Sequence, residues 1–169
     1  IVTHTCDSTG DDSRLWIIPE MEGGEGITRD IVMNGNLYGD WSDYPNTKDY
    51  GGGMVFGEMP QPENTHQYLH GNYSIINDHG VAMGESTCWF TPQDEHTQKL
   101  DELFNQNNNG IIDCYQVQHI ALERAETARE AVQIIAQQVE EYGWNTSAEC
   151  INICDGNEVW IMEVYGLDL

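Results

Sequence analysis

The feature that most constrains the fold of this chain is an amphipathic segment at residues 127–143. Thr127 and Glu130 have the spacing of a capping box at the start of a helix, and Gly143 is a typical helix end. Between these limits the apolar residues recur at helical spacing: Ala128, Ala131, Val132, Ile135, Ala136 and Val139. The segment is therefore predicted to be a helix that buries one face, most simply against a β-sheet.

Strand patterns lie on both sides of this helix in the sequence. Residues 15–18 and 81–87 precede it and have strand-like composition. Residues 151–153 and 159–164 follow it, and the Asp-Gly-Asn turn at residues 155–157 predicts that they form a hairpin. Strands, then helices, then strands again indicate an α+β fold with packed layers rather than a parallel α/β fold.

Residues 34–53 are predicted to form a long irregular loop. They contain Asn-Gly, Gly-Asp and Tyr-Pro pairs and end in three consecutive glycines. A loop of about 20 residues inside a compact domain is more often functional than not. Its three aromatic residues, Tyr38, Trp41 and Tyr44, indicate that it packs against the domain.

The length of 169 residues suits a single domain. Both ends nevertheless have strand-like composition, at residues 1–5 and 160–165, whereas domains usually begin and end in exposed loops. We therefore expect residues 1–169 to be part of a longer protein.

The charge of the chain excludes several classes of partner. Six Lys and Arg residues stand against 29 Asp and Glu residues, for a formal net charge of -23. Such a surface repels nucleic-acid phosphates and anionic membranes, so neither is predicted as a partner. No apolar run reaches the roughly 18 residues that a membrane-spanning helix needs. Hydrophobic residues make up 39% of the chain, which is enough for a core and argues against general disorder.

The cysteines and histidines do not predict a metal site or a cofactor. The five cysteines are odd in number and widely spaced, which argues against a disulfide framework. Cys150 and Cys154 are four apart on a predicted strand, so they share a face and are expected to form a buried thiol pair. His66 and His70 are also four apart, but on a strand that spacing separates the two rings, and no third ligand accompanies them.

Candidate nucleophiles are weak when judged by spacing alone. No Gly-x-Ser-x-Gly motif is present, and Cys88 on a predicted strand is expected to be a small buried side chain. Cys6 shares a strand face with His4 but is favoured as structural. Asn77 precedes a strand of small residues and is either an oxyanion-hole donor or only a turn residue; its spacing leaves both interpretations open.

Four stretches occur in an order that resembles a known family. They are GGGMVFG at residues 51–57, YSIINDHGVAMGESTC at 73–88, ALERAETAREAV at 121–132 and NICDGNEVWIMEVYG at 152–166. Together they resemble the dipeptidase A family of cysteine peptidases, which are N-terminal-nucleophile hydrolases. Secernins and the bile-salt hydrolase and penicillin V acylase group are more distant relatives of similar fold.

The resemblance implies a fold and a mechanism. The fold is an αββα sandwich in which two antiparallel sheets stack between helices, and residues 1–169 would be an incomplete copy of that domain. The catalyst is a cysteine that becomes the first residue when a propeptide removes itself. Its thiol attacks the scissile carbonyl, and its own α-amino group serves as the general base.

The resemblance also assigns residues. The nucleophile has no counterpart in this sequence and is expected before Ile1. Asp7 matches the acid that hydrogen-bonds the nucleophile, and Asn77 matches an asparagine of the oxyanion hole, so these two are the expected catalytic residues. His4 stands where related acylases carry an arginine and is the expected substrate-binding residue. Glu123, Arg124 and Arg129 match a helix motif and are expected to form a structural charge cluster on the helix surface.

The expected function of the intact protein is hydrolysis of dipeptides, with no metal and no cofactor, while residues 1–169 alone are expected to be inactive. Two alternatives remain open. One is a secernin-like interaction protein without catalysis, and the other is a hydrolase of other acyl amides. A cysteine at the upstream position favours a hydrolase, and a substrate panel separates dipeptides from acyl amides.

Overall fold

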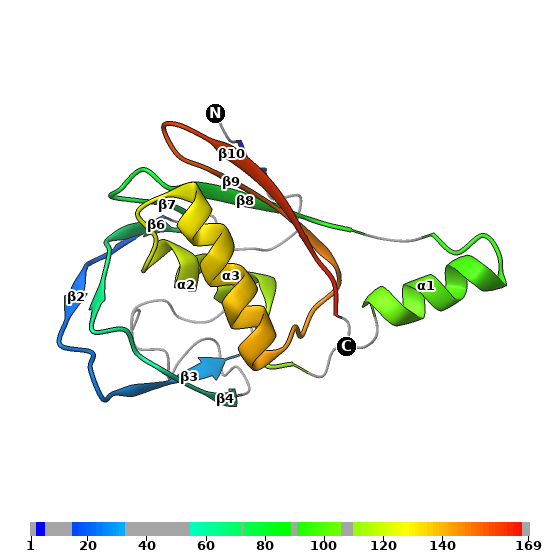
Figure 1. Ribbon diagram of the computed structural model, residues 1–169, viewed down its shortest axis with the longest axis horizontal. Coiled ribbons are helices and arrows are strands. Elements are labelled where there is room, and N and C mark those ends of the chain that lie inside the picture. The colour runs from blue at the N-terminus through cyan, green and yellow to red at the C-terminus, as the bar shows by residue number, and fades with distance from the viewer. Residues whose placement is uncertain are drawn as a thin grey trace.

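The computed structural model describes residues 3–5, 15–32, 55–71, 73–88, 91–105 and 110–166. The fold is α+β, as the order of elements predicts, with a six-stranded antiparallel sheet and two packed helices as its centre (Figure 1). The predicted loop at residues 34–53, Cys6 and Asp7 lie outside the described residues.

The six-stranded sheet has the order β1-β6-β7-β8-β9-β10, and every neighbouring pair is antiparallel. The strands are β1 Trp16–Ile18, β6 Tyr68–His70, β7 Ser74–Asn77, β8 Ala82–Thr87, β9 Glu149–Cys154 and β10 Val159–Val164. Tight hairpins connect β6 to β8 in succession, and the predicted Asp-Gly-Asn hairpin joins β9 to β10. Since β8 pairs with β9, two segments far apart in sequence meet at the middle of the sheet.

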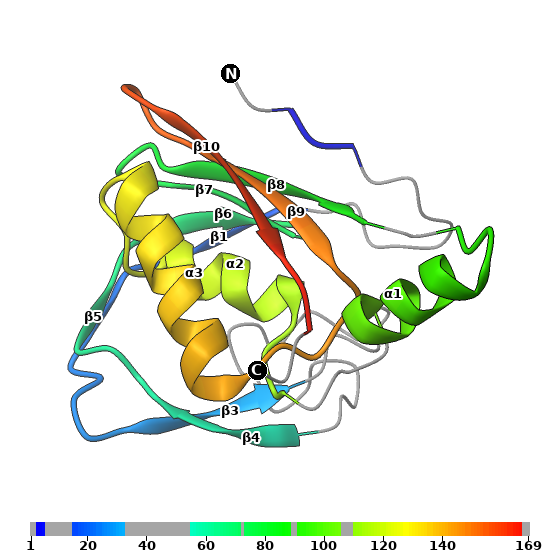
Figure 2. The same ribbon diagram turned by 45° about the vertical axis from the view of Figure 1, so that its right-hand side comes forward.

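Two helices cover one face of this sheet. α2 (Cys114–Leu122) contacts β7 and β8, and α3 (Ala128–Tyr142) contacts β9 and β10. Two further ribbons complete the described fold: β2 (Met21–Glu22) with β5 (Asn64–Thr65), and β3 (Thr28–Val32) with β4 (Val55–Pro60). Figure 2 shows β3 and β4 on the side of the helices away from the six-stranded sheet, so α2 lies in the interior.

The opposite face of the six-stranded sheet is largely apolar and is open along its outer strands. The register aligns one row of side chains on that face across all six strands: Ile17, Leu69, Ile76, Ala82, Cys154 and Val159. Ile17 is 66% exposed, Val159 65% and Ile161 69%. The second sheet of the expected sandwich is not present among residues that the structure describes, where the other sheets have two strands each.

The helix predicted from residues 127–143 is confirmed as α3. Thr127 Oγ1 accepts a hydrogen bond from the Glu130 amide at 3.2 Å, and Gly143 ends the helix with φ 72°, a left-handed value that favours glycine. The Glu130 carboxylate accepts from the Glu126 amide rather than from that of Thr127. The capping box is therefore displaced by one residue from the predicted pattern.

Two other helices accompany α3. α2 begins at Cys114 and ends at Leu122. Its start is set by Asp113, whose carboxylate accepts from the Gln116 amide at 2.6 Å. The other helix is α1 (Glu95–Asn105), whose start is capped by Asp94.

The predicted charge cluster on a helix surface is also wrong, although its residues are structural. Glu123 pairs with Arg29 of β3 at 2.8 Å, where Glu123 is buried and Arg29 is partly buried. Arg129 pairs with Glu158 at 2.9 Å, and its guanidinium lies over the Trp160 ring. Glu123 and Arg129 therefore join the end of α2 and the start of α3 to neighbouring strands.

No helix in the described part of the chain is long and apolar enough to cross a membrane.

Asp155 joins the β9–β10 hairpin to the start of α3, and this contact gives a stability prediction. Its carboxylate accepts from the amides of Asn157, Glu158 and Ala128 at 2.6, 3.0 and 2.8 Å, which lowers its pKa. A lowered carboxyl pKa contributes stability at neutral pH that is lost as the pH falls through the folded-state value.

We expect Asp155→Ala to lower the unfolding temperature at pH 7 and to have a smaller effect below about pH 3.8, the ordinary pKa of an aspartate. Thermal unfolding measured across this pH range checks the prediction, with Glu25→Ala in an exposed turn as the control. An effect of equal size at both ends of the range would contradict it.

Candidate active site

The antiparallel order brings several polar residues to one end of the six-stranded sheet. Tyr73 precedes β7, Thr87 ends β8 and Glu149 begins β9, so all three lie at this end. The N-terminus of α2, with Cys114, contributes to the same region, because the electrostatic field of Glu149 acts on its thiol. We call this region the acidic end of the sheet.

Glu85 and Glu149 form a carboxyl pair at the acidic end. Glu149 is directly opposite Thr87 in the ladder, and Glu85 lies two residues before Thr87 on the same face. Thr87 Oγ1 donates to Glu149 Oε1 at 3.1 Å. Burial and the hydrogen bond and negative charge of Glu85 together raise the pKa of Glu149 to about 8.

Burial and the neighbouring Glu85 both favour the protonated form of Glu149. Glu149 Oε2 is buried and has no hydrogen-bond partner in the described part of the chain. Two neighbouring carboxylates that are both unprotonated repel each other, so a shared proton converts repulsion into a hydrogen bond. The pair can therefore donate a proton or a hydrogen bond at a pH where ordinary carboxyl groups cannot.

His4 reaches the acidic end from the beginning of the chain. Its Nε2 lies 3.3 Å from Glu85 Oε1, and its ring meets Tyr73 edge to face at 5.6 Å between centroids. Figure 2 shows residues 3–5 running beside β8. His4, the expected substrate-binding residue, is thus in contact with the carboxyl pair. Neither Glu85 nor Glu149 was predicted from the sequence to belong to the site.

None of the described cysteines with a perturbed pKa is activated as a nucleophile. Burial raises the pKa of Cys114 well above its ordinary value, and the charges of Asp113 and Glu149 raise it further. Burial also raises the pKa of Cys88 and of Cys150, again with help from neighbouring carboxylates. These groups remain thiols at neutral pH, whereas a catalytic cysteine needs an environment that favours the thiolate. Cys88 is only partly buried, less than expected.

Tyr115 links the acidic end to a group of buried aromatic side chains. Its hydroxyl lies 2.8 Å from His70 Nε2, and its ring packs edge to face against Tyr73 and His119. Burial lowers the pKa of His70 to about 3 and that of His119 well below its ordinary value. Both imidazoles are therefore neutral at physiological pH and serve as packing and hydrogen-bonding groups.

Asn77 lies at the other end of the sheet. Its side-chain oxygen accepts from the amides of His79 and Val81, at 3.1 and 3.0 Å. Its Nδ2 donates to the carbonyls of Leu122 and Ala125, at 3.0 and 2.7 Å. Every polar group of the side chain is thus engaged in holding the β7–β8 turn against the end of α2.

The structure does not bring Asn77 and His4 together. Glu85, which His4 contacts, is four residues beyond Val81 along β8, or about 13 Å at the ordinary rise of a strand. Of the two interpretations of Asn77, the observed hydrogen bonds are those of a turn residue. Asp7 lies outside the described residues, so its predicted place beside the nucleophile stays a prediction.

A comparison with known protein families covers some of these site residues. A family model described as "Peptidase family C69" matches residues 52–167. The matched region includes Asn77 and the Glu85–Glu149 pair, while His4 and Asp7 precede it. No solved structure matches the chain.

The carboxyl pair predicts how stability depends on pH. A carboxyl group whose pKa is raised on folding stabilises the folded state at a pH below its pKa in the unfolded chain. That stabilisation is lost as the pH rises toward the pKa of the folded state, which is about 8 for Glu149. We expect Glu149→Gln to remove this loss, because an amide keeps a donor without the charge. Above pH 8 the variant should therefore be at least as stable as the wild type.

Urea unfolding at pH 5 and at pH 8.5 measures this difference in stability. Glu20→Gln, at an exposed position, is the control. A stability of E149Q that changes with pH in parallel with that of the wild type would refute the prediction.

The hydrogen bonds of Asn77 give a second stability prediction. Asn77→Ala leaves two carbonyls and two amides without their partner, and we expect a loss of about 2–4 kcal/mol in the free energy of unfolding. Chemical denaturation measures the loss. Asn157→Ala, in the exposed β9–β10 turn, should change the same quantity by no more than about 0.5 kcal/mol. Equal effects of the two substitutions would contradict the assignment.

Proposed function

Since the chain belongs to peptidase family C69, we propose that it is part of a cysteine dipeptidase that hydrolyses the amide bond of dipeptides. The family match over residues 52–167 is the observation that carries the proposal. It bears out the expectation of a peptidase of the cysteine class. The preference for dipeptides and the N-terminal nucleophile come from the sequence resemblance.

The proposed reaction uses a cysteine that stands before residue 1. Its thiol attacks the carbonyl carbon of the substrate, and its α-amino group accepts the thiol proton. The amine of the leaving amino acid takes a proton as the C–N bond breaks, and water hydrolyses the remaining acyl-enzyme. The raised pKa of Cys88, Cys114 and Cys150 supports this choice, because these three cysteines lack the activation that the attack requires.

The acidic end of the sheet is the proposed position of this chemistry. His4 already lies there, and the nucleophile would precede His4 by a short stretch of chain. A dipeptide carries an α-ammonium group, which carboxylates bind, and an α-carboxylate, which a protonated imidazole or carboxyl binds. Glu85, Glu149 and His4 offer both kinds of partner within one cluster.

The proposal treats the two expected catalytic residues differently. Asp7 is proposed to hydrogen-bond the amine of the nucleophile, on the strength of the resemblance. Asn77 would have to release the carbonyl of Leu122 or Ala125 before its amide donated to an oxyanion. The proposed mechanism therefore does not depend on the Asn77 side chain.

The proposed fold of the whole domain is the αββα sandwich. The face of the six-stranded sheet opposite the helices supports it, since Ile17, Val159 and Ile161 are apolar and exposed there. A second antiparallel sheet packed at the usual spacing of about 10 Å would bury them. Ser86 and Asn152 on the same face would then lie between the two sheets.

The proposal predicts the effect of removing Asp7. In the intact protein we expect Asp7→Ala to lower kcat for dipeptides by about 10²-fold or more, since a group that holds a catalytic amine contributes on that scale. The unfolding temperature should change little. Steady-state kinetics with a dipeptide panel, alongside thermal unfolding, checks this, and Glu25→Ala is the surface control.

The same assay separates the alternatives. Hydrolysis of dipeptides that is lost when the upstream cysteine is replaced by alanine supports the proposal. Hydrolysis of N-acyl amides in preference to dipeptides would identify the acyl-amide hydrolase instead. A folded intact protein that hydrolyses neither class would identify a non-catalytic member, and dipeptide turnover by residues 1–169 alone would overturn the assignment of the nucleophile.

A further inference from the structure

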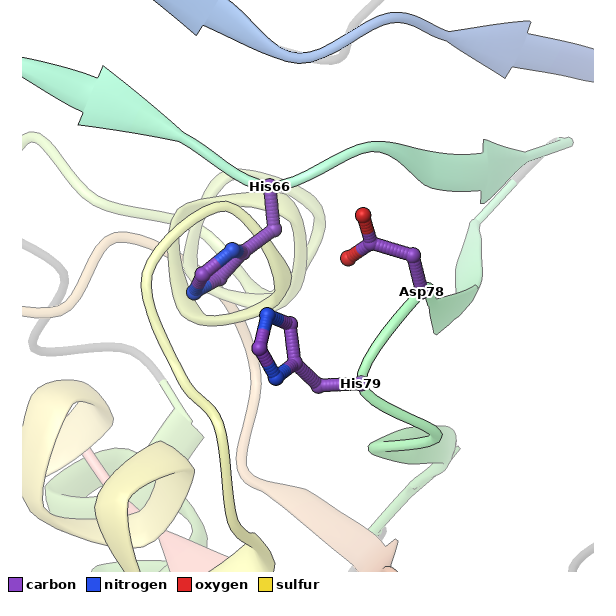
Figure 3. Close-up of side chains that lie close together, drawn as sticks. All are labelled: His66, Asp78 and His79. Carbon is purple, nitrogen blue, oxygen red and sulfur yellow. The ribbon is translucent and has the colours of Figure 1, made fainter.

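We propose that His66, Asp78 and His79 form a binding site for a divalent transition-metal ion, for which Zn²⁺ is the best match. One ligand atom from each of the three side chains lies within 4.8 Å of the other two. Figure 3 shows the three side chains approaching one another from two separate segments of backbone. This cluster is at the end of the sheet away from Glu85 and Glu149, so it is distinct from the proposed active site.

The backbone of all three residues is held in place by the same helix end. His66 lies between β5 and β6, and its amide donates to the Glu123 carbonyl at 2.8 Å. The Asp78 amide donates to the Gln67 carbonyl at 3.0 Å, which joins the two ligand-bearing segments directly. The Asn77 side chain ties the turn of Asp78 and His79 to the carbonyls of Leu122 and Ala125. A rigid scaffold of this kind reduces the cost of ordering ligands around an ion.

The donor set has the chemistry of a zinc site. Two imidazoles and one carboxylate are the ligands that Zn²⁺ takes in sites with three protein ligands and one open position. Zinc–ligand distances of about 2.0–2.2 Å place the ligand atoms of a tetrahedral site about 3.4 Å apart, so small side-chain rotations would close the observed set. Ca²⁺ and Mg²⁺ prefer oxygen ligands and fit this set poorly.

The surroundings favour entry and binding of a cation. Asp78 and His79 are exposed and His66 is half-buried, so an ion can reach the cluster from solvent. The two imidazole rings lie only 4.1 Å apart between centroids, so a ring nitrogen of each can reach the same ion. The net charge of -23 also raises the local concentration of cations near the surface.

The structure explains why this cluster differs from the pair considered in the sequence. His66 and His70 are close in sequence, but His70 is buried against the Tyr115 hydroxyl and does not join the cluster. Asp78 and His79 approach His66 because the β6–β7–β8 meander folds back on itself. A bound ion would therefore join the segment before β6 to the β7–β8 turn.

The test is a titration of the metal-free chain with ZnCl₂, followed by isothermal calorimetry and by the histidine side-chain NMR spectrum. We expect one binding site, a rise in the unfolding temperature with Zn²⁺, and shifts in the resonances of His66 and His79 but not of His96. His66→Ala and His79→Ala should each weaken binding at least tenfold. His96→Ala, on the exposed face of α1, is the matched control and should leave the affinity unchanged.

A spectroscopic measurement separates this site from the free cysteines, which also bind zinc. Co²⁺ bound by two imidazoles and a carboxylate lacks the intense charge-transfer absorption that thiolate ligands produce. That absorption in the Co²⁺ complex, or Zn²⁺ affinity unchanged in His79→Ala, would overturn the proposal. The NMR titration uses the unmodified chain, so histidine resonances that do not respond to Zn²⁺ would overturn it even if a variant failed to fold.

Discussion

The burial of α2 is the constraint on which the rest of the structure depends. All nine residues of this helix are buried, because the six-stranded sheet covers one side and the β3–β4 ribbon lies on another (Figure 2). A helix that is covered on all sides cannot shift without disturbing both layers. Its two ends therefore act as fixed points for the segments that contact them.

Each end of α2 supports a different polar cluster. At the N-terminal end, Asp113 caps the helix and Cys114 contributes to the environment of Glu149. At the C-terminal end, the carbonyls of Leu122 and Ala125 hold the Asn77 turn, and Glu123 binds Arg29 of β3. The proposed active site and the proposed metal site are thus separated by the length of the sheet but share one rigid support. A substitution inside α2 would be expected to disturb both clusters, whereas changes in Glu149 or His79 would disturb only one.

The two faces of the six-stranded sheet have different surroundings. One face packs on the helices and forms the core with Met83, Ile151 and Ile153. The other carries Ile17, Val159 and Ile161 in contact with solvent, in a chain that is otherwise strongly acidic. Exposed apolar side chains aligned across a sheet are typical of a surface that packs against another layer. This asymmetry is the structural feature that agrees best with the proposed sandwich.

The elements whose signals are local could be predicted from the amino-acid sequence. The capping residues and apolar stripe of α3, the β9–β10 hairpin and the α+β class all follow from spacings of a few residues. The contacts that depend on long-range pairing became visible only in the folded chain. Glu85 and Glu149 meet because β8 pairs with β9, His66 meets His79 through a meander, and α2 extends over polar residues because its neighbours bury it. A carboxyl group can share a proton, and an imidazole can join a metal site, only when a residue distant in sequence lies within a few ångströms. The spacing of residues along the chain does not give that distance.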